Sequence, residues 1–457
     1  MVRRVGLATM FLLVVAPRGA QAVPSFARQV GVGCPTCHTA FPQLTEFGRQ
    51  FKLNGYTMSD GKTHLPPIAV MVQAPTFTHT AADQPGGAAP HFSANDNVAV
   101  NQLSLFYAGR LFGPYAETLF GERVGDILDH AGTFIQGTWD GAGKEWSWDN
   151  SELRIAAPQT VSDIPVVFGA YTNNNPSMED LWNTVPAWGF PFSGSGLAPG
   201  PMAAPLLTGL GQQVMGAGVY AQANAGSNEF YATVAGYGTL PAGTQTSLGV
   251  DPNGETEIDS GAPYWRLAFE HEWGLHSLEV GSYGLHARTF PQRIESSGTD
   301  AITDVGFDSQ YQYLGGEHDV TVMVNYLEEW AAWDASQPLG LTSHGTDHLW
   351  TMTTTASYLY DKTYGADVQY FHSGGNQDAL LYGTRTGAPD SSGWVFQVDY
   401  LPFNKGGGPA FWPMSNAKLS LQYVLYDKFD GSRGNFDGSG RDASDNDTLY
   451  LELWLAF

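Results

Sequence analysis

The sequence predicts an all-β protein, a transmembrane antiparallel β-barrel of about sixteen strands. Three observations lead to this fold class. Only 14% of the 457 residues are charged, against about 25% in ordinary soluble domains. No stretch after the N-terminus approaches the roughly 18 consecutive apolar residues that a membrane helix needs. From residue 68 onward, apolar and polar side chains alternate with a period of two, as in strands with one face in lipid and one in a polar lumen.

Residues 1–22 are predicted to be a signal peptide. Arg3 and Arg4 form its basic region, an apolar run follows, and Ala20 and Ala22 flank one residue in a small-x-small cleavage site. The alternative, an N-terminal membrane anchor, needs a longer apolar run. We therefore expect the mature chain to be exported from the cytoplasm.

The two cysteines of the chain lie in Cys34-Pro35-Thr36-Cys37-His38. C-x-x-C-H is the attachment signature of c-type haem, in which each thiol bonds one vinyl group and the histidine becomes an axial iron ligand. A redox or structural disulfide is the alternative, but no βαβ pattern surrounds the motif as in a thioredoxin-like site. We predict one covalently attached haem c, with Cys34, Cys37 and His38 as the redox centre and His38 as the metal ligand.

The sixth iron ligand has three candidates downstream of the motif, Met58, His64 and Met71. A methionine in this position raises the reduction potential relative to a histidine. Met58 is favoured because it follows 47–53, a stretch that can fold back over the ring. The spacing leaves the choice among the three open.

Residues 23–64 form the haem-bearing segment. At about forty residues it is near the size below which chains usually need disulfides, metals or oligomerisation to fold alone. We expect it to pack against the rest of the chain as a short cytochrome c-like segment that plugs the barrel lumen. Arg28, Arg49 and Lys52 are candidates to neutralise the haem propionates, or are simply solvated.

Residues 65–457 form the predicted porin-like barrel. In its last strand Leu451 and Leu453 fall on one face and Glu452 on the other. A soluble sandwich also has one apolar and one polar face, so the alternation alone does not decide between the two folds. The expected strands are 68–79, 98–111, 130–139, 146–157, 165–172, 213–224, 228–238, 263–273, 275–288, 303–314, 318–330, 348–360, 363–373, 392–402, 416–427 and 446–457.

The lengths of the connections favour the barrel. From the sixth strand onward, short turns alternate with long polar loops, as outer-membrane barrels alternate periplasmic turns with extracellular loops. The turn at 403–415 is one long exception, and 112–129 is too long for a simple turn, so we expect a short helix there. A sandwich gives no reason for this alternation. The predicted location is the outer membrane of a Gram-negative cell.

The longest loop, 173–213, has about forty residues and contains Trp182, Trp188 and Phe190. Loops of this length are usually functional or disordered, and the aromatic residues and prolines argue against full disorder. Two interpretations remain open. The loop either folds into the barrel mouth and constricts it, or forms an external cap.

Histidines and acidic residues outside the haem motif give no second metal site. His344 and His348 are four residues apart in one outer loop, and His271 and His276 straddle a tight turn; each is interpreted as an ordinary polar residue. The acidic clusters of the outer loops serve either solubility or attraction of cations to a negative mouth. These clusters are Glu255, Glu257 and Asp259; Asp430, Asp437, Asp442 and Asp445; and Glu179 with Asp180.

The order of these features resembles a known family. The haem motif follows the sequence of 24–29 and precedes 41–56, PSFARQ and FPQLTEFGRQFKLNGY, and the long loop carries NNNP at 173–176. This arrangement is similar to the fused outer-membrane monohaem c-type cytochrome–porins of iron(II)-oxidising bacteria, along the whole mature chain. The resemblance implies oxidation of iron(II), with the electron delivered inward. Of its functional residues, only Cys34, Cys37 and His38 are carried over.

The expected function is therefore extracellular electron transfer by a one-electron oxidoreductase. It would oxidise external iron(II) and pass electrons through haem c to a periplasmic carrier, a soluble cytochrome c or a copper protein. A diffusion porin with a structural haem plug is one alternative, and an electron conduit for another donor is a second. The net charge of −24 excludes nucleic acid as a partner, because such binding requires clustered Lys and Arg.

Overall fold

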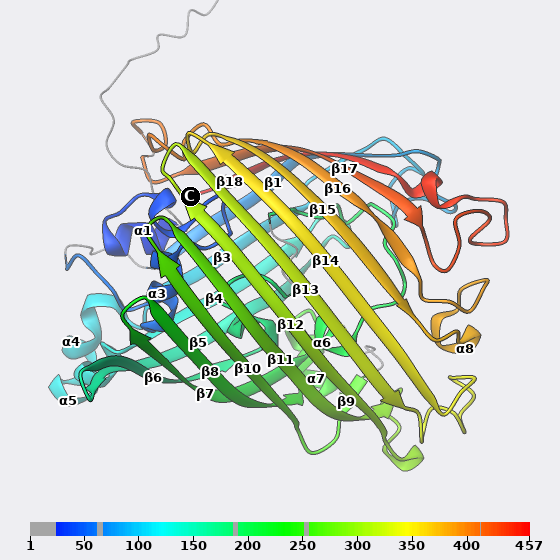
Figure 1. The fold of residues 1–457 in the computed structure, drawn as a ribbon, viewed down its shortest axis with the longest axis horizontal. Helices are drawn as coiled ribbons and strands as arrows, with labels where there is room; N and C mark the ends of the chain where they lie inside the picture. The colour runs from blue at the N-terminus through cyan, green and yellow to red at the C-terminus, as the bar shows by residue number, and fades with distance from the viewer. Residues whose placement is uncertain (1–23, 62–66, 186–190, 251–255, 412) are drawn as a thin grey trace, which may run out of the picture.

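The computed structural model describes residues 24–61, 67–185, 191–250, 256–411 and 413–457 (Figure 1). The predicted signal peptide lies outside the described residues, as do His64, Trp188, Phe190 and Glu255. None of the helices in the described part of the chain is long and apolar enough to cross a membrane.

The described chain forms one antiparallel sheet of eighteen strands that closes on itself, because β1 pairs with β18. The strands are β1 (Ile68–Thr80), β2 (Asn97–Ala99), β3 (Gln102–Arg110), β4 (Ala131–Asp140), β5 (Glu145–Val161), β6 (Ile164–Asn173), β7 (Val214–Ala225), β8 (Asn228–Thr239), β9 (Thr256–Ile258), β10 (Ala262–Trp273), β11 (His276–Pro291), β12 (Asp300–Leu314), β13 (His318–Ala332), β14 (Thr346–Tyr360), β15 (Tyr364–Gly375), β16 (Ser391–Tyr400), β17 (Asn416–Lys428) and β18 (Thr448–Ala456).

Two of these strands are short continuations of longer ones. β2 pairs with residues 76–78 of β1, whereas β3 pairs with residues 68–73, so β2 continues β3 along the same neighbouring strand. In the same way, β9 continues β10 along β11. The wall therefore consists of sixteen membrane-crossing strands, which confirms the predicted number. Each pairs with its neighbours in sequence, so closure leaves no edge strand.

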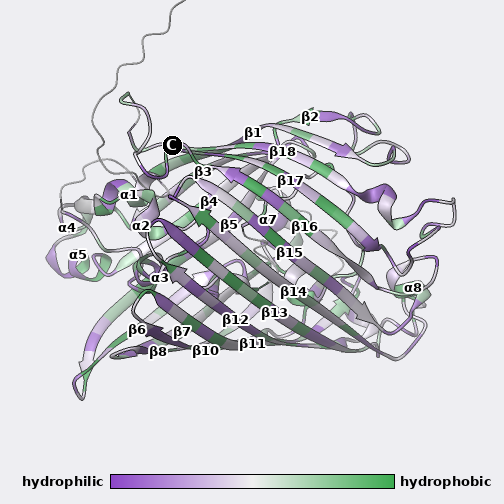
Figure 2. Cartoon of the chain, turned by 45° about the horizontal axis from the view of Figure 1, so that its top comes forward, coloured by the Kyte–Doolittle hydropathy of each residue, from purple (hydrophilic) through white to green (hydrophobic). Residues whose placement is uncertain are grey.

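The side chains of the wall alternate as expected for a barrel in lipid. Along β13, Thr321, Met323 and Asn325 are at most 4% exposed and face the lumen. Val324, between two of them, is 39% exposed and faces outward. Figure 2 shows the same alternation of polar and apolar residues along the strands. Because only lipid favours an apolar outer wall of this extent, the chain is an outer-membrane β-barrel.

Exposed aromatic residues mark both ends of the wall. Trp273 and Tyr360 lie near strand ends joined by short turns, Tyr400 lies at the same end of the barrel, and Trp330 and Trp394 lie at the opposite end. Aromatic girdles of this kind occupy the two membrane–water interfaces of outer-membrane barrels. Two belts place the membrane between them.

The connections confirm the predicted alternation. Turns of two or three residues join β5–β6, β7–β8, β10–β11, β12–β13 and β14–β15 at one end, and longer loops lie at the other end. We call these the periplasmic end and the outer end, following the usual orientation of such barrels. The expected helix in 112–129 is present as η1 (Gly113–Tyr115), α4 (Ala116–Phe120) and α5 (Glu122–Leu128).

The remaining helices are short. Three form the N-terminal segment, and the others lie in the outer loops. They are α1 (Pro24–Val30), α2 (Cys34–Cys37), α3 (Glu46–Leu53), η2 (Pro176–Glu179), α6 (Leu206–Gly209), α7 (Ala242–Ser247), η3 (Glu295–Ser297), α8 (Ala379–Tyr382) and η4 (Ala443–Asn446).

The N-terminal segment lies inside the periplasmic end of the barrel (Figure 1). The Arg49 side chain pairs with Glu270 on β10, and Tyr56 donates a hydrogen bond of 2.9 Å to Glu152 on β5. Gln43 contacts the sulfur of Met323 on β13. Because these partners come from widely separated strands, the segment is held on several sides of the lumen.

The loop between β6 and β7 also folds into the lumen. Its residues 174–185 are all buried, and Trp182, 1% exposed, donates through Nε1 to Glu270. Further along, the backbone N–H of Leu207 donates to Asp304 on β12. The constricting interpretation of this loop is therefore correct, and the external cap is wrong.

Candidate functional site

The Cys34–Cys37 motif forms a single helical turn. The turn begins after Gly33 and ends at His38, whose backbone N–H donates to the Cys34 carbonyl at 3.0 Å. Helical residues three apart lie on one side, so the two thiols face the same space. No disulfide joins these two described cysteines, and burial raises the pKa of the Cys37 thiol to about 12.

The His38 side chain is held in one tautomer. Its Nδ1 lies 2.9 Å from the Pro42 carbonyl oxygen, which can only accept a hydrogen bond. Nδ1 therefore carries the proton and Nε2 keeps its lone pair. Burial lowers the pKa of His38 to about 4 despite backbone hydrogen bonds that favour the charged form. A neutral imidazole fixed by a backbone carbonyl is the usual state of a metal-ligating histidine.

A cavity of about 470 Å³ adjoins the motif and is lined by Cys34, Cys37 and His38. This volume is within the range of about 300–1,000 Å³ that ligand and cofactor sites occupy. The cavity walls come from three parts of the chain: the N-terminal segment, the barrel wall and the inward loop. Its aromatic lining consists of Phe26, Phe41, Phe51, Tyr56, Phe106, Phe134, Phe192 and Trp454.

These residues fit a covalently attached haem. Two thiols and an imidazole nitrogen with a free lone pair border one largely apolar space, and aromatic rings complete its wall. An apolar, enclosed surrounding is one of the means by which proteins tune a haem potential. Sequence reasoning found Cys34, Cys37 and His38, and the fold brings all three to the same cavity.

The sixth-ligand candidates differ in position. Met71 on β1 lines the cavity, whereas Met58 does not. The Met58 backbone carbonyl accepts a hydrogen bond from Gln29. His64 lies outside the described residues. A second cavity methionine, Met178, comes from η2 in the inward loop. The sequence did not indicate Met178, because only the inward fold of its loop brings it to the cavity.

The three basic residues expected near the propionates have separate roles. Lys52 lines the cavity, where burial lowers its pKa although nearby carboxylates oppose that shift. Arg49 does not line the cavity, because its guanidinium pairs with Glu270. Arg28 donates to the carbonyl of Ile68. Only Lys52 is therefore placed to meet an acidic group of a ligand in the cavity.

Helix α3 supports the haem motif through a close backbone contact. A Cβ atom on Gly48 would lie 2.3 Å from the Cys37 carbonyl oxygen, so glycine permits the approach. The Thr45 side chain caps α3 by accepting from the Gly48 backbone N–H and donates to the Thr36 carbonyl at 2.6 Å. These contacts join the motif to the helix that carries Arg49.

Buried arginines hold the inward loop beside the cavity. Arg154 contacts Glu179 at 2.6 Å, and Arg266 lies 3.1 Å from Asp180. Both acidic side chains are fully buried. The prediction that Glu179 and Asp180 serve as outer-loop surface charges is therefore wrong. Their partners lie on β5 and β10, and a lone arginine on the polar face of a strand is the signal that points to such pairing.

The other histidines occupy different places. His271 and His276 both stack against Trp273, on the outer wall near the periplasmic end. His348 stacks against Trp330 on the outer wall. His344 instead lies beside Asp347 and Asp378 at the outer end. The fold thus separates His344 from His348 and gives it two acidic neighbours.

No protein-family model matches the sequence, and no curated protein matches it. Solved structures with a similar shape include OmpT, an outer membrane protein of Vibrio cholerae, at 10% identity, with 85% of this chain and 96% of that chain covered and a TM-score of 0.40. An anion-selective porin from Comamonas acidovorans is 11% identical, with 85% and 98% covered and a TM-score of 0.43. Salmonella typhi OmpF, solved as a complex with Daunomycin, is also 11% identical, with 85% and 97% covered and a TM-score of 0.43. The fold assignment rests on the strand pairing and not on these scores.

Proposed function

We propose that the chain is an outer-membrane oxidoreductase that takes single electrons from extracellular iron(II) and delivers them to a periplasmic acceptor. The observation that carries the proposal is the Cys34–His38 turn, which borders a cavity inside a membrane-spanning barrel. The resemblance to the cytochrome–porin family supplies the substrate. The acceptor would be a soluble cytochrome c or a copper protein.

The residues of the motif would hold one haem c. Cys34 and Cys37 would form the two thioether bonds, and His38 Nε2 would bind the iron. Bound there, the haem supplies a redox centre that accepts and donates one electron at a time. Lys52 is placed to pair with an acidic substituent of the porphyrin.

The surroundings of the cavity serve this role in two ways. The N-terminal segment and the inward loop both lie in the lumen and border the cavity, so they restrict water around the redox centre and strengthen electrostatic interactions there. They also leave the motif near the periplasmic end, within reach of an acceptor on that side. Iron(III), the oxidised product, stays outside the cell.

Anaerobic mixing tests the proposal. Purified full-length protein in detergent, added to iron(II), should develop the absorption bands of ferrous haem within minutes. The Cys34→Ala/Cys37→Ala variant should lack them because it cannot attach the cofactor. Wild-type haem that dithionite reduces but iron(II) does not would contradict iron(II) as the donor and leave an electron conduit for another donor.

A further inference from the structure

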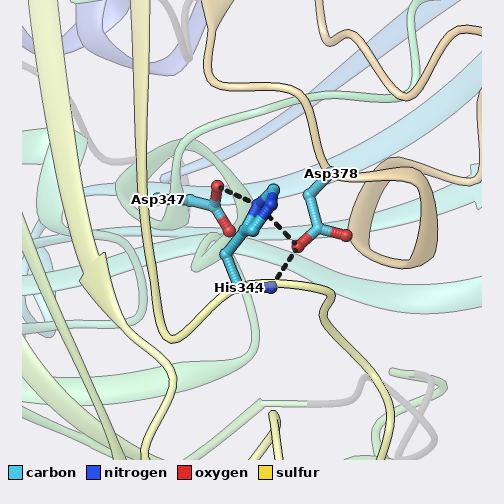
Figure 3. A group of neighbouring side chains, drawn as sticks. All are labelled: His344, Asp347 and Asp378. Carbon is cyan, nitrogen blue, oxygen red and sulfur yellow. Dashed lines mark hydrogen bonds and ion pairs between the residues drawn. The ribbon is translucent and has the colours of Figure 1, made fainter.

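Three side chains, from the loop before β14, from β14 itself and from the loop before α8, meet at the outer end of the barrel (Figure 3). His344 precedes β14, Asp347 lies at the start of β14, and Asp378 directly precedes α8. Each offers one ligand atom, and these atoms all lie within 4.8 Å of one another. His344 Nδ1 is 3.7 Å from Asp347 Oδ1 and 3.7 Å from Asp378 Oδ2. The imidazole nitrogen therefore faces both carboxylates without forming a hydrogen bond to either.

The two carboxylates lack a permanent positive partner. Their side chains are 2% and 0% exposed, whereas the His344 side chain is 56% exposed. Within the described part of the chain, the ion pairs found for Asp347 and Asp378 are all with His344. Two adjacent buried carboxylates repel each other unless a proton or a cation lies between them. A cation bound between the two carboxylates would relieve this repulsion.

An unsatisfied oxygen atom provides an independent indication. Asp347 Oδ2 accepts from Trp333 Nε1 at 3.0 Å, but Oδ1 is buried and accepts no hydrogen bond from any described residue. Asp347 as a whole is only 6% exposed. A buried polar atom without a partner needs an explanation, and an ion or a water at that atom is one of them. This oxygen is the one that faces His344 Nδ1.

The backbone fixes the geometry of the cluster. Asp378 Oδ1 caps α8 by accepting from Leu380 and Leu381, and its Oδ2 accepts from the backbone N–H groups of Ser343 and His344. Asp378 thus ties the loop that carries His344 to the loop before α8. The donor atoms are held together before any ion arrives, which lowers the cost of binding.

The donor set indicates the class of ion. Imidazole nitrogen with carboxylate oxygen suits first-row transition ions, whereas calcium and magnesium sites use oxygen alone. Such an ion forms a bond of about 2.0–2.2 Å to each donor atom. To share one ion, the donor atoms must therefore lie slightly closer to one another than their present separation of 3.7 Å. The exposed side of His344 leaves room for water ligands and for exchange of the ion.

We propose that His344, Asp347 and Asp378 bind a first-row divalent metal ion, and that extracellular iron(II) docks there when it reaches the outer end. The docking role rests on the function proposed above, whereas the metal site stands on the geometry alone. The net charge of −24 also attracts cations to the protein, which favours binding at this site.

Manganese(II) provides a probe that does not depend on haem chemistry. Full-length protein in detergent is titrated with Mn²⁺, and free Mn²⁺ is measured by electron paramagnetic resonance. At saturation of this site, wild type should hold one Mn²⁺ more than His344→Ala or Asp347→Asn at the same free Mn²⁺ concentration. Each variant should lose at least tenfold in the affinity of this site for Mn²⁺. His348→Ala is the matched control, because this side chain lies on the outer wall, and it should bind as wild type does.

Competition identifies the ion and separates the two proposals. Anaerobic iron(II) should displace the bound Mn²⁺, whereas Ca²⁺ at the same concentration should not. Equal Mn²⁺ binding by wild type and both variants would overturn the site, and equal displacement by Ca²⁺ would overturn its assignment to transition ions. Iron(II) that displaces Mn²⁺ but leaves the haem oxidised would support the site and contradict the proposed function. An unchanged KM for iron(II) in His344→Ala, with Mn²⁺ binding lost, would overturn the docking role.

Discussion

The pairing of Arg49 with Glu270 predicts how firmly the N-terminal segment is fixed in the barrel. Arg49 Nη2 lies 2.5 Å from Glu270 Oε1, and the two side chains are 1% and 2% exposed. In Arg49→Met, the Glu270 carboxylate would keep one side-chain hydrogen-bond donor among the described residues, the Trp182 indole. Breaking a buried pair in this way typically costs about 3–5 kcal/mol. The docked state of the segment should lose stability by that amount.

Limited proteolysis in detergent measures this loss. A cost of about 3 kcal/mol corresponds to roughly a hundredfold rise in the undocked population. Cleavage within the N-terminal segment should accelerate by a similar factor, provided that opening and closing are fast relative to cleavage. The exposed Arg123 on α5 gives a matched control, and Arg123→Met should leave the cleavage rate unchanged.

The double variant Arg49→Met/Glu270→Gln completes the test. It removes both charges and keeps an acceptor for the Trp182 indole, so it should recover most of the protease resistance. An increase in cleavage below about tenfold in Arg49→Met, which is about 1.4 kcal/mol, would refute the reasoning. Equal sensitivity of the single and double variants would also refute it, because the loss would then not come from an unpaired buried carboxylate.

Other expected results concern the cavity and the lumen. Met71→Ala/Met178→Ala should lower the haem reduction potential in spectroelectrochemistry, because both methionines line the cavity and a methionine ligand raises the potential. Met58→Ala should leave the potential and spectrum unchanged, and a shift there would restore Met58 as the ligand. Gly48→Ala should reduce the haem-to-protein ratio, because the new Cβ would lie 2.3 Å from the Cys37 carbonyl oxygen. Helix α3 would have to move away by about 1 Å to restore normal packing. A normal ratio would contradict this expectation. Liposomes that contain the full chain should not swell in small sugars, and swelling would favour the diffusion porin.

The barrel wall was predictable because lipid imposes a simple rule on it. Every strand must present apolar side chains outward, so the period of two persists from β1 to β18. The Cys34–His38 motif could be recognised because the attachment chemistry that it predicts depends on five adjacent residues; the haem itself stays a prediction. Both signals are local in sequence, because each strand shows its own alternation and the haem motif occupies five consecutive residues.

The contents of the lumen were not predictable in the same way. Glu179 and Asp180 read as loop charges until the fold pairs them with Arg154 and Arg266 on distant strands. Met178 reaches the cavity only because that loop turns inward. These contacts join residues that are far apart in sequence, and a single sequence carries no period that relates them.

The outer cluster illustrates the same limit. The sequence places His344 four residues from His348 in one expected outer loop. His344 instead lies in the loop before β14, whereas His348 lies within β14 and faces the outer wall beside Trp330. The acidic partner Asp378 comes from the next outer loop. Its approach depends on the adjacency of β14 and β15, which only the closed sheet specifies.

The position of the haem motif inside a closed barrel constrains the order of assembly. Cys34 and Cys37 are 2% and 6% exposed once the plug is docked, and the strand that follows the plug, β1, forms the closing seam with β18. An enzyme that ligates haem to these thiols cannot reach them in the finished protein. On the proposed function, the cofactor must therefore be attached in the periplasm before the plug docks. The membrane insertion machinery would then receive a chain whose first folded part already carries its haem.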